Sequence, residues 1–200
     1  ITRLKSRHIF LNLYSEIWNL RSKILQIAVG SLDIVMPIYS QYQPAMPATY
    51  GYYLLAIENN LRINQSYLKQ LVNTINISPL GSASGAGTTI PINPNITAEL
   101  LGFDYFSLNA LSNISSRDLE LMLLSSGTIF GVNISRIAQD YQIWCTQEFG
   151  FFDFPDNLCG ISSAMPQKKN PYLLEKIKGK AISISGKLFS SLAIMQKTPF

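Results

Sequence analysis

"GISSAMPQKKNP", residues 160–171, is the stretch on which the interpretation of the fold depends. It combines paired serines, two adjacent lysines and an Asn-Pro step in a chain of which only 14% of the residues are charged. Asn170-Pro171 predicts the start of a helix, with Asn at the N-cap and Pro at the first helical position. A polar loop therefore leads directly into a long helix.

This loop has the chemistry of an anion site. Free N–H groups and the dipole at a helix N-terminus favour an anion, and Lys168 adds a full positive charge within one turn of that point. Ser162 and Ser163 add hydroxyl groups. Together they could bind a carboxylate and stabilise negative charge that develops on it in an elimination. The local pattern alone leaves an ordinary capped helix with a basic first turn as an alternative.

The rest of the chain predicts helices joined by loops. Apolar residues recur at helical spacing, and four long helices follow from them: 4–32, 50–75, about 116–148 behind a Ser115 or Ser116 cap, and 171–196. A short helix is expected at 97–101, with Gly102 as its stop. We find no useful strand alternation. The predicted fold class is all-α, a bundle of long helices.

Three polar segments are predicted to be loops. They are 36–47, with three prolines, 78–95, and 149–170. Because they follow helices of different direction, we expect a site that is assembled across subunits. The "GSASGAG" at 81–87 fits neither of the common nucleotide-binding glycine motifs.

Composition is that of a globular, soluble protein. The 200 residues are 47% apolar, enough for one domain with a sizeable core. No apolar run reaches the roughly 18 residues that span a bilayer, the stretch 119–134 predicts a buried helix, and the N-terminus does not resemble a signal peptide. Cys145 and Cys159 have neither metal-ligand spacing nor the density of a disulfide framework, which fits a reducing cytosol. We therefore expect a cytoplasmic protein.

Positive charge is concentrated near the C-terminal end. The net charge of +4 is too small to indicate nucleic acid. From Ser162 onward, however, Glu175 is the only acid among seven lysines, so this part should attract anions such as a di- or tricarboxylate. A solvated lysine face is the alternative. The lysines are 168, 169, 176, 178, 180, 187 and 197.

"SSAMPQKKNP" resembles the signature loop of the fumarase/aspartase superfamily, Gly-Ser-Ser-x-Met-Pro-x-Lys-x-Asn-Pro, and its Gln-Lys-Lys version is typical of argininosuccinate lyases. Further segments resemble that family in order and spacing, so that the resemblance covers nearly the whole chain. They are "PLGSASGAG" (79–87), "LGFD" (101–104), "NALSNISSRDLE" (109–120) and "CTQEFGF" (145–151).

The resemblance implies an enzyme. Residues 1–200 are expected to form the central helical-bundle domain, with the family's N-terminal and C-terminal domains absent from this chain. The family is a homotetramer with a 20-helix core, in which each active site takes loops from three subunits. Its reaction is the reversible β-elimination of argininosuccinate to arginine and fumarate, without metal or organic cofactor. We expect a small-molecule substrate, and neither nucleic acid nor a membrane as partner.

The resemblance also assigns roles to residues of the signature loop. Ser162 matches the catalytic serine, which removes the proton from the carbon β to the leaving nitrogen. Lys168 and Asn170 match the residues that hold the resulting dianionic carboxylate. Outside the loop, Arg117 matches an arginine that lies near the substrate.

The 36–47 segment carries a departure from the family. Ser40 matches a substrate-binding Thr and Gln43 a family Gln, but Met-Pro-Gly-Tyr-Thr-His is "MPIYSQ" here, so that Gln41 replaces the proton-transfer His. An amide can hydrogen-bond but cannot shuttle a proton at neutral pH. A second departure is Ile161, where the family has Gly, which is expected to stiffen or misplace the loop. The single histidine, His8, lies in the first helix and does not match the family position.

Two alternatives to an active argininosuccinate lyase remain. One is a catalytically impaired homologue with a structural or partner-binding role, which Gln41 and Ile161 favour. The other is a lyase for a different aspartate adduct, against which the Gln-Lys-Lys signature argues. The intact set of Ser162, Lys168 and Asn170 favours the enzyme, although we expect no activity from residues 1–200 alone.

Overall fold

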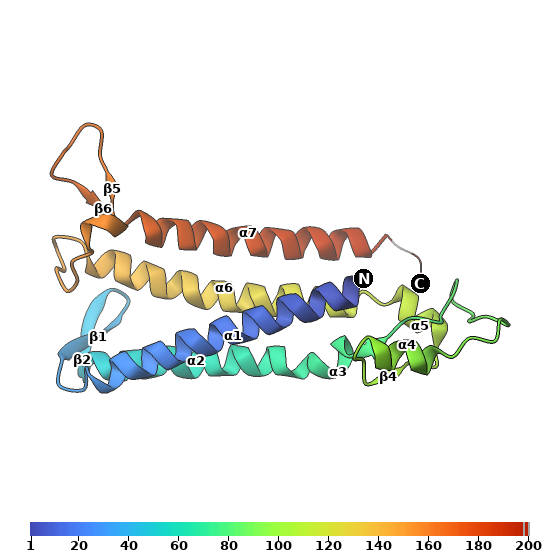
Figure 1. Ribbon diagram of the computed structural model, residues 1–200. Helices are drawn as coiled ribbons and strands as arrows, with labels where there is room; N and C mark the ends of the chain where they lie inside the picture. The colour runs from blue at the N-terminus through green and yellow to red at the C-terminus, as the bar shows by residue number, and fades with distance from the viewer. Residues whose placement is uncertain (198, 200) are drawn as a thin grey trace. The chain divides into compact units, whose positions relative to one another are not determined.

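The computed structural model describes residues 1–197 and 199, and its internal contacts divide the chain into two units. The first unit contains Ile1–Leu123 and the residues from Leu192 onward, and the second is Leu124–Ser191. The four predicted long helices are present, and the all-α class is confirmed (Figure 1). They are α1 (Thr2–Val29), α2 (Tyr50–Gln70), α6 (Asp118–Trp144) and α7 (Tyr172–Met195).

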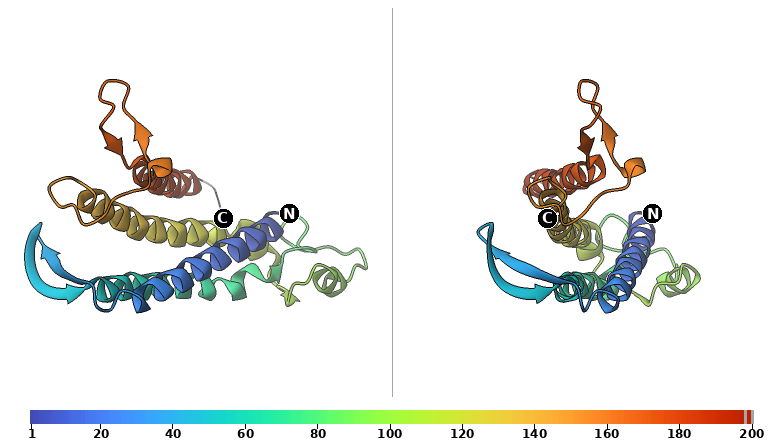
Figure 2. Two further views of the ribbon diagram at one scale, coloured as in Figure 1. Left: turned by 60° about the vertical axis from the view of Figure 1, so that its left-hand side comes forward. Right: turned by 90° about the vertical axis from the view of Figure 1, so that its left-hand side faces the viewer.

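The helices α1 and α2 build the core of the first unit. They run antiparallel and side by side along their length (Figure 1 and Figure 2). Leu54, Leu61 and Leu68 recur every seven residues on α2 and are each at most 3% exposed. Ile17 of α1 is 1% exposed. A seven-residue repeat keeps one seam of a helix against its neighbour, and each buried Leu or Ile contributes about 1.5–3 kcal/mol.

One polar cluster lies within the α1–α2 interface. Arg21 Nε donates to Glu58 Oε1 at 2.8 Å, and Arg21 Nη1 donates to Gln65 Oε1 at 2.5 Å. Gln65 Nε2 in turn donates to the carbonyl of Tyr14 at 3.1 Å. Buried polar groups are tolerated when they are hydrogen-bonded, and Arg21, Glu58 and Gln65 each have a hydrogen-bond partner in this cluster.

The segment predicted as a proline-rich loop is instead a β-hairpin. Strands β1 (Val35–Ser40) and β2 (Gln43–Thr49) pair antiparallel around a two-residue turn. The turn residues Gln41 and Tyr42 have φ values of 52° and 60°, as in the turns that match the twist of a hairpin. Prolines are compatible with this two-stranded ribbon because each strand has an outer edge without a partner strand. A residue whose N–H would face that edge loses no ladder hydrogen bond when it is a proline. The loop prediction was wrong because it rested on the number of prolines, and the pairing of these two strands tolerates them.

Shorter elements complete the first unit at the other end of α1 and α2. These are α3 (Val72–Ile75), β3 (Ile77–Ser78), α4 (Pro94–Leu100), β4 (Tyr105–Phe106) and α5 (Ala110–Ser115). The helix predicted at 97–101 begins earlier, because the side chain of Asn93 caps it by accepting from the Asn95 N–H at 3.1 Å. Gly102, with φ 65°, follows its end as predicted.

In the second unit, α6 and α7 approach each other at small residues. A Cβ placed on Gly131 would lie 3.5 Å from Ala181, which is ordinary contact distance. Lys178 Nζ of α7 donates to Gln139 Oε1 at 2.7 Å and also to Gln142 Oε1, both on α6. The two helices therefore approach closely at Gly131 and Ala181, although the space at position 131 would also accept a methyl group.

The helix α6 ends at Trp144, four residues before the predicted end. Within the described part of the chain it is the one helix long and apolar enough to cross a membrane by length and composition. Only 17% of its apolar window is buried, whereas the sequence predicted a buried helix. Burial within a single chain therefore does not account for the apolar composition of α6.

Candidate active site

The signature loop is closed at its base by a short pair of strands. Strands β5 (Gly160–Ile161) and β6 (Lys169–Asn170) pair antiparallel, with Gly160 opposite Asn170 and Ile161 opposite Lys169. Ser162 and Lys168 are the next residues on either side. The sequence predicted an irregular segment here, because two-residue strands leave no pattern of alternation. We call this strand pair, with Ser162 and Lys168 next to it, the neck of the loop. The pairing brings the predicted base, Ser162, and the predicted cation, Lys168, to the neck.

Inside the loop, backbone groups organise the serine. Ser162 Oγ accepts a hydrogen bond from the Met165 N–H at 3.1 Å, and the Met165 carbonyl accepts from the Lys168 N–H at 3.0 Å. A donor on a serine oxygen stabilises negative charge there. The turn that links Ser162 to Lys168 thus also places a hydrogen-bond donor on the serine oxygen.

Lys168 is the free cation of the loop. Its side chain is exposed and makes no hydrogen bond or ion pair with any of residues 1–197 or 199. Asn170 Nδ2, by contrast, donates to the carbonyl of Gly160 at 3.4 Å. The predicted N-cap position of Asn170 is wrong, because Asn170 is paired in strand β6 and α7 begins only at Tyr172.

The backbone at Ile161 requires no glycine. This residue is in the extended strand β5, and positive φ values among the described non-glycine residues occur at Gln41, Tyr42 and Ala83. Its side chain is 93% exposed. A β-branched residue suits extended backbone, so Ile161 fits the neck without strain.

An ion-pair cluster beside the neck was missed by the sequence analysis. Lys169 Nζ lies 2.8 Å from Asp153 Oδ1 and 3.0 Å from Asp156 Oδ1. Hydrogen bonds to Asp153 and then Asp156 raise the pKa of Lys169 above its usual value. The signal in the sequence was the pair of acids in a stretch otherwise dominated by phenylalanine.

An aromatic cluster holds the segment that carries these acids. The N–H groups of Phe151 and Phe152 both donate to the carbonyl of Trp144, at 2.9 and 3.3 Å. The Phe152 ring lies 5.9 Å from the Trp144 ring and 5.0 Å from that of Tyr141. The phenylalanines therefore anchor the chain to the end of α6.

Three other predicted residues meet at the tip of the β1–β2 hairpin. Ser40 pairs with Gln43 at the last position of the ladder, and Gln41 is the first turn residue. All three are exposed. The hairpin tip thus carries the hydroxyl and two amides that the resemblance assigns to the site, and their role stays a prediction.

Arg117 lies at the opposite end of the first unit. Its Nη1 donates to the carbonyls of Ile114 and Ser116, at 2.7 and 3.0 Å, and so caps the end of α5. With Arg3, Thr74 and Glu120 it lines a cavity of about 550 Å³. The 21 residues of α2 separate this cavity from the hairpin, about 30 Å at 1.5 Å per residue. A single chain therefore does not bring Arg117 to Ser40.

Arg3 is a further residue that the sequence analysis missed. Its Nη1 donates to the carbonyls of Thr74 and Ile77, at 3.1 and 3.0 Å, and burial lowers the pKa of its guanidinium. It thereby ties α1 to the chain beyond α2 at the wall of the cavity.

Comparison with known proteins places these features in a family. A profile of the lyase family matches residues 3–186. The chain belongs to this lyase family. It is 41% identical over 198 residues to argininosuccinate lyase 1 of Shouchella clausii, and 36% identical over 185 residues to argininosuccinate lyase of Chromohalobacter salexigens. These matches cover 99% and 92% of the chain, and the chain spans 40% of the length of each relative.

Solved structures give the same result for the fold of this lyase-family chain. It matches EDDS lyase, including a variant with bound fumarate, with a TM-score of 0.96 and 34% identity over 98% of the chain and 40% of that structure. Class II fumarase from Schistosoma mansoni matches with a TM-score of 0.80 at 16% identity, over 93% of the chain and 44% of that structure. The predicted fumarase/aspartase superfamily fold is confirmed.

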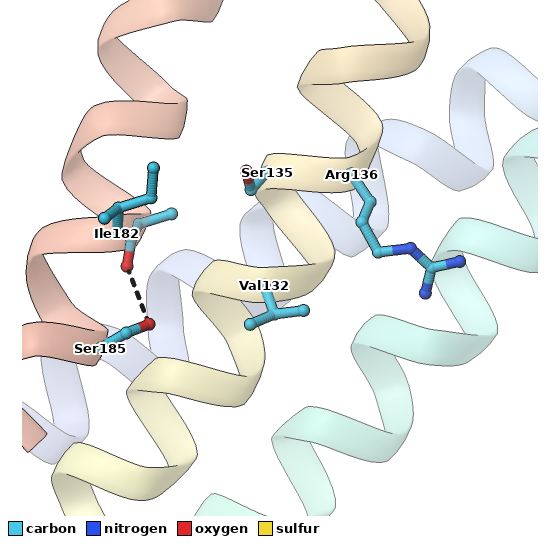
Figure 3. A pocket seen from close by; sticks show the side chains of 6 residues that line it. Val132, Ser135, Arg136, Ile182 and Ser185 are labelled. Atoms are coloured by element: carbon cyan, nitrogen blue, oxygen red, sulfur yellow. Dashed lines mark hydrogen bonds between the residues drawn. The ribbon is translucent and has the colours of Figure 1, made fainter. Parts of the chain in front are cut away.

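A second, smaller cavity in the lyase-family chain lacks the features of a reaction site. It measures about 160 Å³, lies between α6 and α7, and includes Val132, Ala181 and Ile182 in its lining (Figure 3). Arg136 points away from α7, and the Ser185 hydroxyl donates to the carbonyl of Ala181 at 3.4 Å (Figure 3). The signature loop and the hairpin tip remain the candidate active-site elements.

Proposed function

We propose that this chain is the central helical domain of an enzyme that cleaves argininosuccinate reversibly to arginine and fumarate. The observation that carries the proposal is the neck of the signature loop, where Ser162 and Lys168 flank one strand pair and Lys168 has an uncommitted charge. Similarity to argininosuccinate lyases over nearly the whole chain supports the choice of substrate.

The geometry suits a β-elimination. Ser162 Oγ, as the alkoxide, takes the proton from the carbon next to the carboxylate, and the C–H electrons form the double bond. The C–N bond breaks with its electron pair going to the departing nitrogen, which takes up a proton from solvent. Negative charge builds on the carboxylate as the proton leaves, and the ammonium of Lys168 with the amide of Asn170 stabilises it. The Met165 N–H on Ser162 Oγ, at 3.1 Å, supports the serine in this role.

The proposed enzyme is a homotetramer located in the cytoplasm. Ser40, Gln41 and Gln43 lie at one end of the first unit and Arg117 at the other, so a complete site requires more than one copy. Large apolar side chains remain exposed on the long helices, for example Trp18 on α1 and Phe189 on α7, at 56% and 76%. Exposed apolar faces of this kind fit burial between subunits. We propose that the family's other domains lie outside these 200 residues.

Two specific observations support alternative functions. Gln41 occupies the position of the family histidine at the exposed hairpin tip, which favours an impaired homologue with a structural or partner-binding role. The 34% identity to EDDS lyase favours a lyase that acts on a different aspartate adduct. Both alternatives leave the fold unchanged: the impaired homologue turns over no substrate, and the other lyase turns over a different adduct.

The test is fumarate release, followed by ultraviolet absorbance, from argininosuccinate and from other aspartate adducts. The protein is the full-length product, with Lys168→Ala as the matched inactive variant. Turnover of argininosuccinate that disappears in Lys168→Ala supports the proposal. Turnover of another adduct alone shifts the substrate, and intact tetramers without any turnover support the impaired homologue. Residues 1–200 alone are expected to show no turnover.

A further inference from the structure

The two adjacent lysines of the signature loop have different environments. Lys168 is exposed and uncommitted among the described residues, whereas Lys169 Nζ contacts one carboxylate oxygen each of Asp153 and Asp156, at 2.8 and 3.0 Å. Lys169 is the first residue of β6 and Lys168 precedes the strand, so the two neighbouring cations lie in different local structures.

Charge counting argues against a direct role for Lys169 in binding the substrate. One ammonium between two carboxylates leaves a local charge of about −1, which repels rather than attracts a di- or tricarboxylate. Lys169 would have to leave both acids to reach such a ligand. The cluster therefore has a different task from that of Lys168.

The contacts of Lys169 connect the loop to the rigid end of α6. Trp144 binds Phe151 and Phe152 through its carbonyl and its ring, and Asp153 follows directly. Asp153 holds Lys169, and Lys169 pairs with Ile161 across the neck. Ser162 and Lys168 extend from these two paired residues. The ion-pair cluster thus gives the neck a contact with the segment that is anchored at the end of α6.

We propose that Lys169 is a positioning residue, whose ion pairs with Asp153 and Asp156 fix the neck that carries Ser162 and Lys168. The proposal rests on the proposed function, because the neck is what places the proton acceptor and the cation on the substrate. Small displacements of reacting groups cost up to roughly 10²-fold in rate.

The decisive comparison uses the full-length protein and five variants, the fifth of which adds Lys169→Met to the double variant Asp153→Asn/Asp156→Asn. Lys169→Met removes the charge at similar length, and Lys169→Arg keeps it. Asp153→Asn combined with Asp156→Asn removes the partners, and Lys187→Met, an exposed lysine of α7, is the matched control. The readouts are kcat and KM for fumarate release, and hydrogen exchange of the peptide that spans residues 160–170.

The expected result is a loss of about tenfold or more in kcat/KM for Lys169→Met, with faster exchange at 160–170 and unchanged exchange in α6. Lys169→Arg should recover most of the activity, and Lys187→Met should behave as wild type. Adding Lys169→Met to the double Asn variant should cost little more, because coupled residues are non-additive. A purely structural lysine elsewhere would show neither rescue nor this coupling.

Wild-type exchange and wild-type turnover in Lys169→Met would overturn the proposal, as would additive losses. Turnover that is lost with unchanged exchange at 160–170 would also overturn it and assign Lys169 to the substrate instead. A wild-type protein without turnover overturns the proposed function, while the exchange of the variants still decides whether Lys169 holds the neck.

Discussion

Ser162 and Lys168 each lie one residue beyond the Ile161–Lys169 pair, the last pair of the β5–β6 ladder at the neck of one loop. Ile161 and Lys169, as opposite residues of an antiparallel pair, have Cα atoms about 4.5–5.5 Å apart. Backbone pairing therefore brings together two groups that are six positions apart in the sequence.

Lys168 should be essential for both binding and turnover. Lys168→Ala in the full-length protein removes the charge that balances the dianion, and we expect kcat/KM to fall by about 10²-fold or more. Binding of fumarate, measured by calorimetry, should be lost in parallel. Lys176→Ala, at an exposed lysine whose Nζ donates to Tyr172 in the first turns of α7, is the control and should leave both unchanged. Normal binding in Lys168→Ala would place the anion site elsewhere.

Gln41→His should restore a proton-transfer group at the hairpin tip. A general acid or base contributes roughly 10²–10⁴-fold in rate, and we expect kcat to rise at least about tenfold while KM changes little. Histidine tolerates the left-handed backbone at φ 52° better than most residues. Tyr42→His, at the neighbouring turn position with φ 60°, is the matched control. Equal kcat values for wild type and Gln41→His would show that another group supplies the proton.

The long helices could be predicted from the sequence because their stabilising contacts repeat with the helix period. Leu54, Leu61 and Leu68 show this directly, since the residues that define the pattern are those that are buried. The hairpin at 35–49 could not be predicted in this way. Its two strands depend on their register and on the left-handed turn at Gln41 and Tyr42, and neither produces an apolar alternation.

The sequence predicted residues of the candidate site but not the contacts that they make. Ser162 and Lys168 were assigned from their motif, and their roles stay predictions. The partners of Lys169 were missed, since Asp153 and Asp156 lie 16 and 13 positions earlier in a segment without periodicity. Asn170 was assigned to a helix cap on local preference, and pairing with Gly160 overrode that preference. Contacts between irregular segments leave no periodic signal in a single sequence.

Gly81 should be the glycine of the 78–93 loop that is most sensitive to substitution. Its φ is 98°, and an added Cβ would lie 2.6 Å from Pro94 Cγ, too close for any packing. Gly81→Ala should therefore destabilise the chain by more than about 1–2 kcal/mol. The control Gly87→Ala has φ 74° but nothing within 4 Å of the added atom, so it should show the backbone cost alone. Thermal unfolding compares the two, and equal losses would contradict the clash.

Cys145 should react slowly with alkylating reagents near neutral pH. Burial raises the pKa of its thiol, and its Sγ donates to the Gln142 carbonyl at 3.3 Å, so the thiolate that reacts is scarce. Labelling by iodoacetamide, followed by mass spectrometry, should be slower than for the same cysteine in the urea-unfolded chain. The difference should narrow as the pH rises above the ordinary thiol value of about 8.5. Equal rates in folded and unfolded chain at pH 7 would contradict the shift.

Arg21 should be the most costly polar side chain of the α1–α2 interface to remove. It pairs with Glu58, and the two side chains are only 14% and 11% exposed. Arg21→Met leaves Glu58 charged and without its cation, and breaking such a buried pair costs about 3–5 kcal/mol. Arg62→Met is the control, because the exposed Arg62 donates only to Asn59 at 2.8 Å and should change stability by less than about 0.5 kcal/mol.

Replacing both members, Arg21→Met with Glu58→Met, should recover much of the loss, because it removes the unpaired charge and leaves apolar side chains of similar length. Urea unfolding at one fixed protein concentration measures all four proteins, since subunit association also shifts the apparent stability. A double variant as unstable as Arg21→Met would show that the hydrogen bonds of this cluster, and not the unpaired charge, determine the cost.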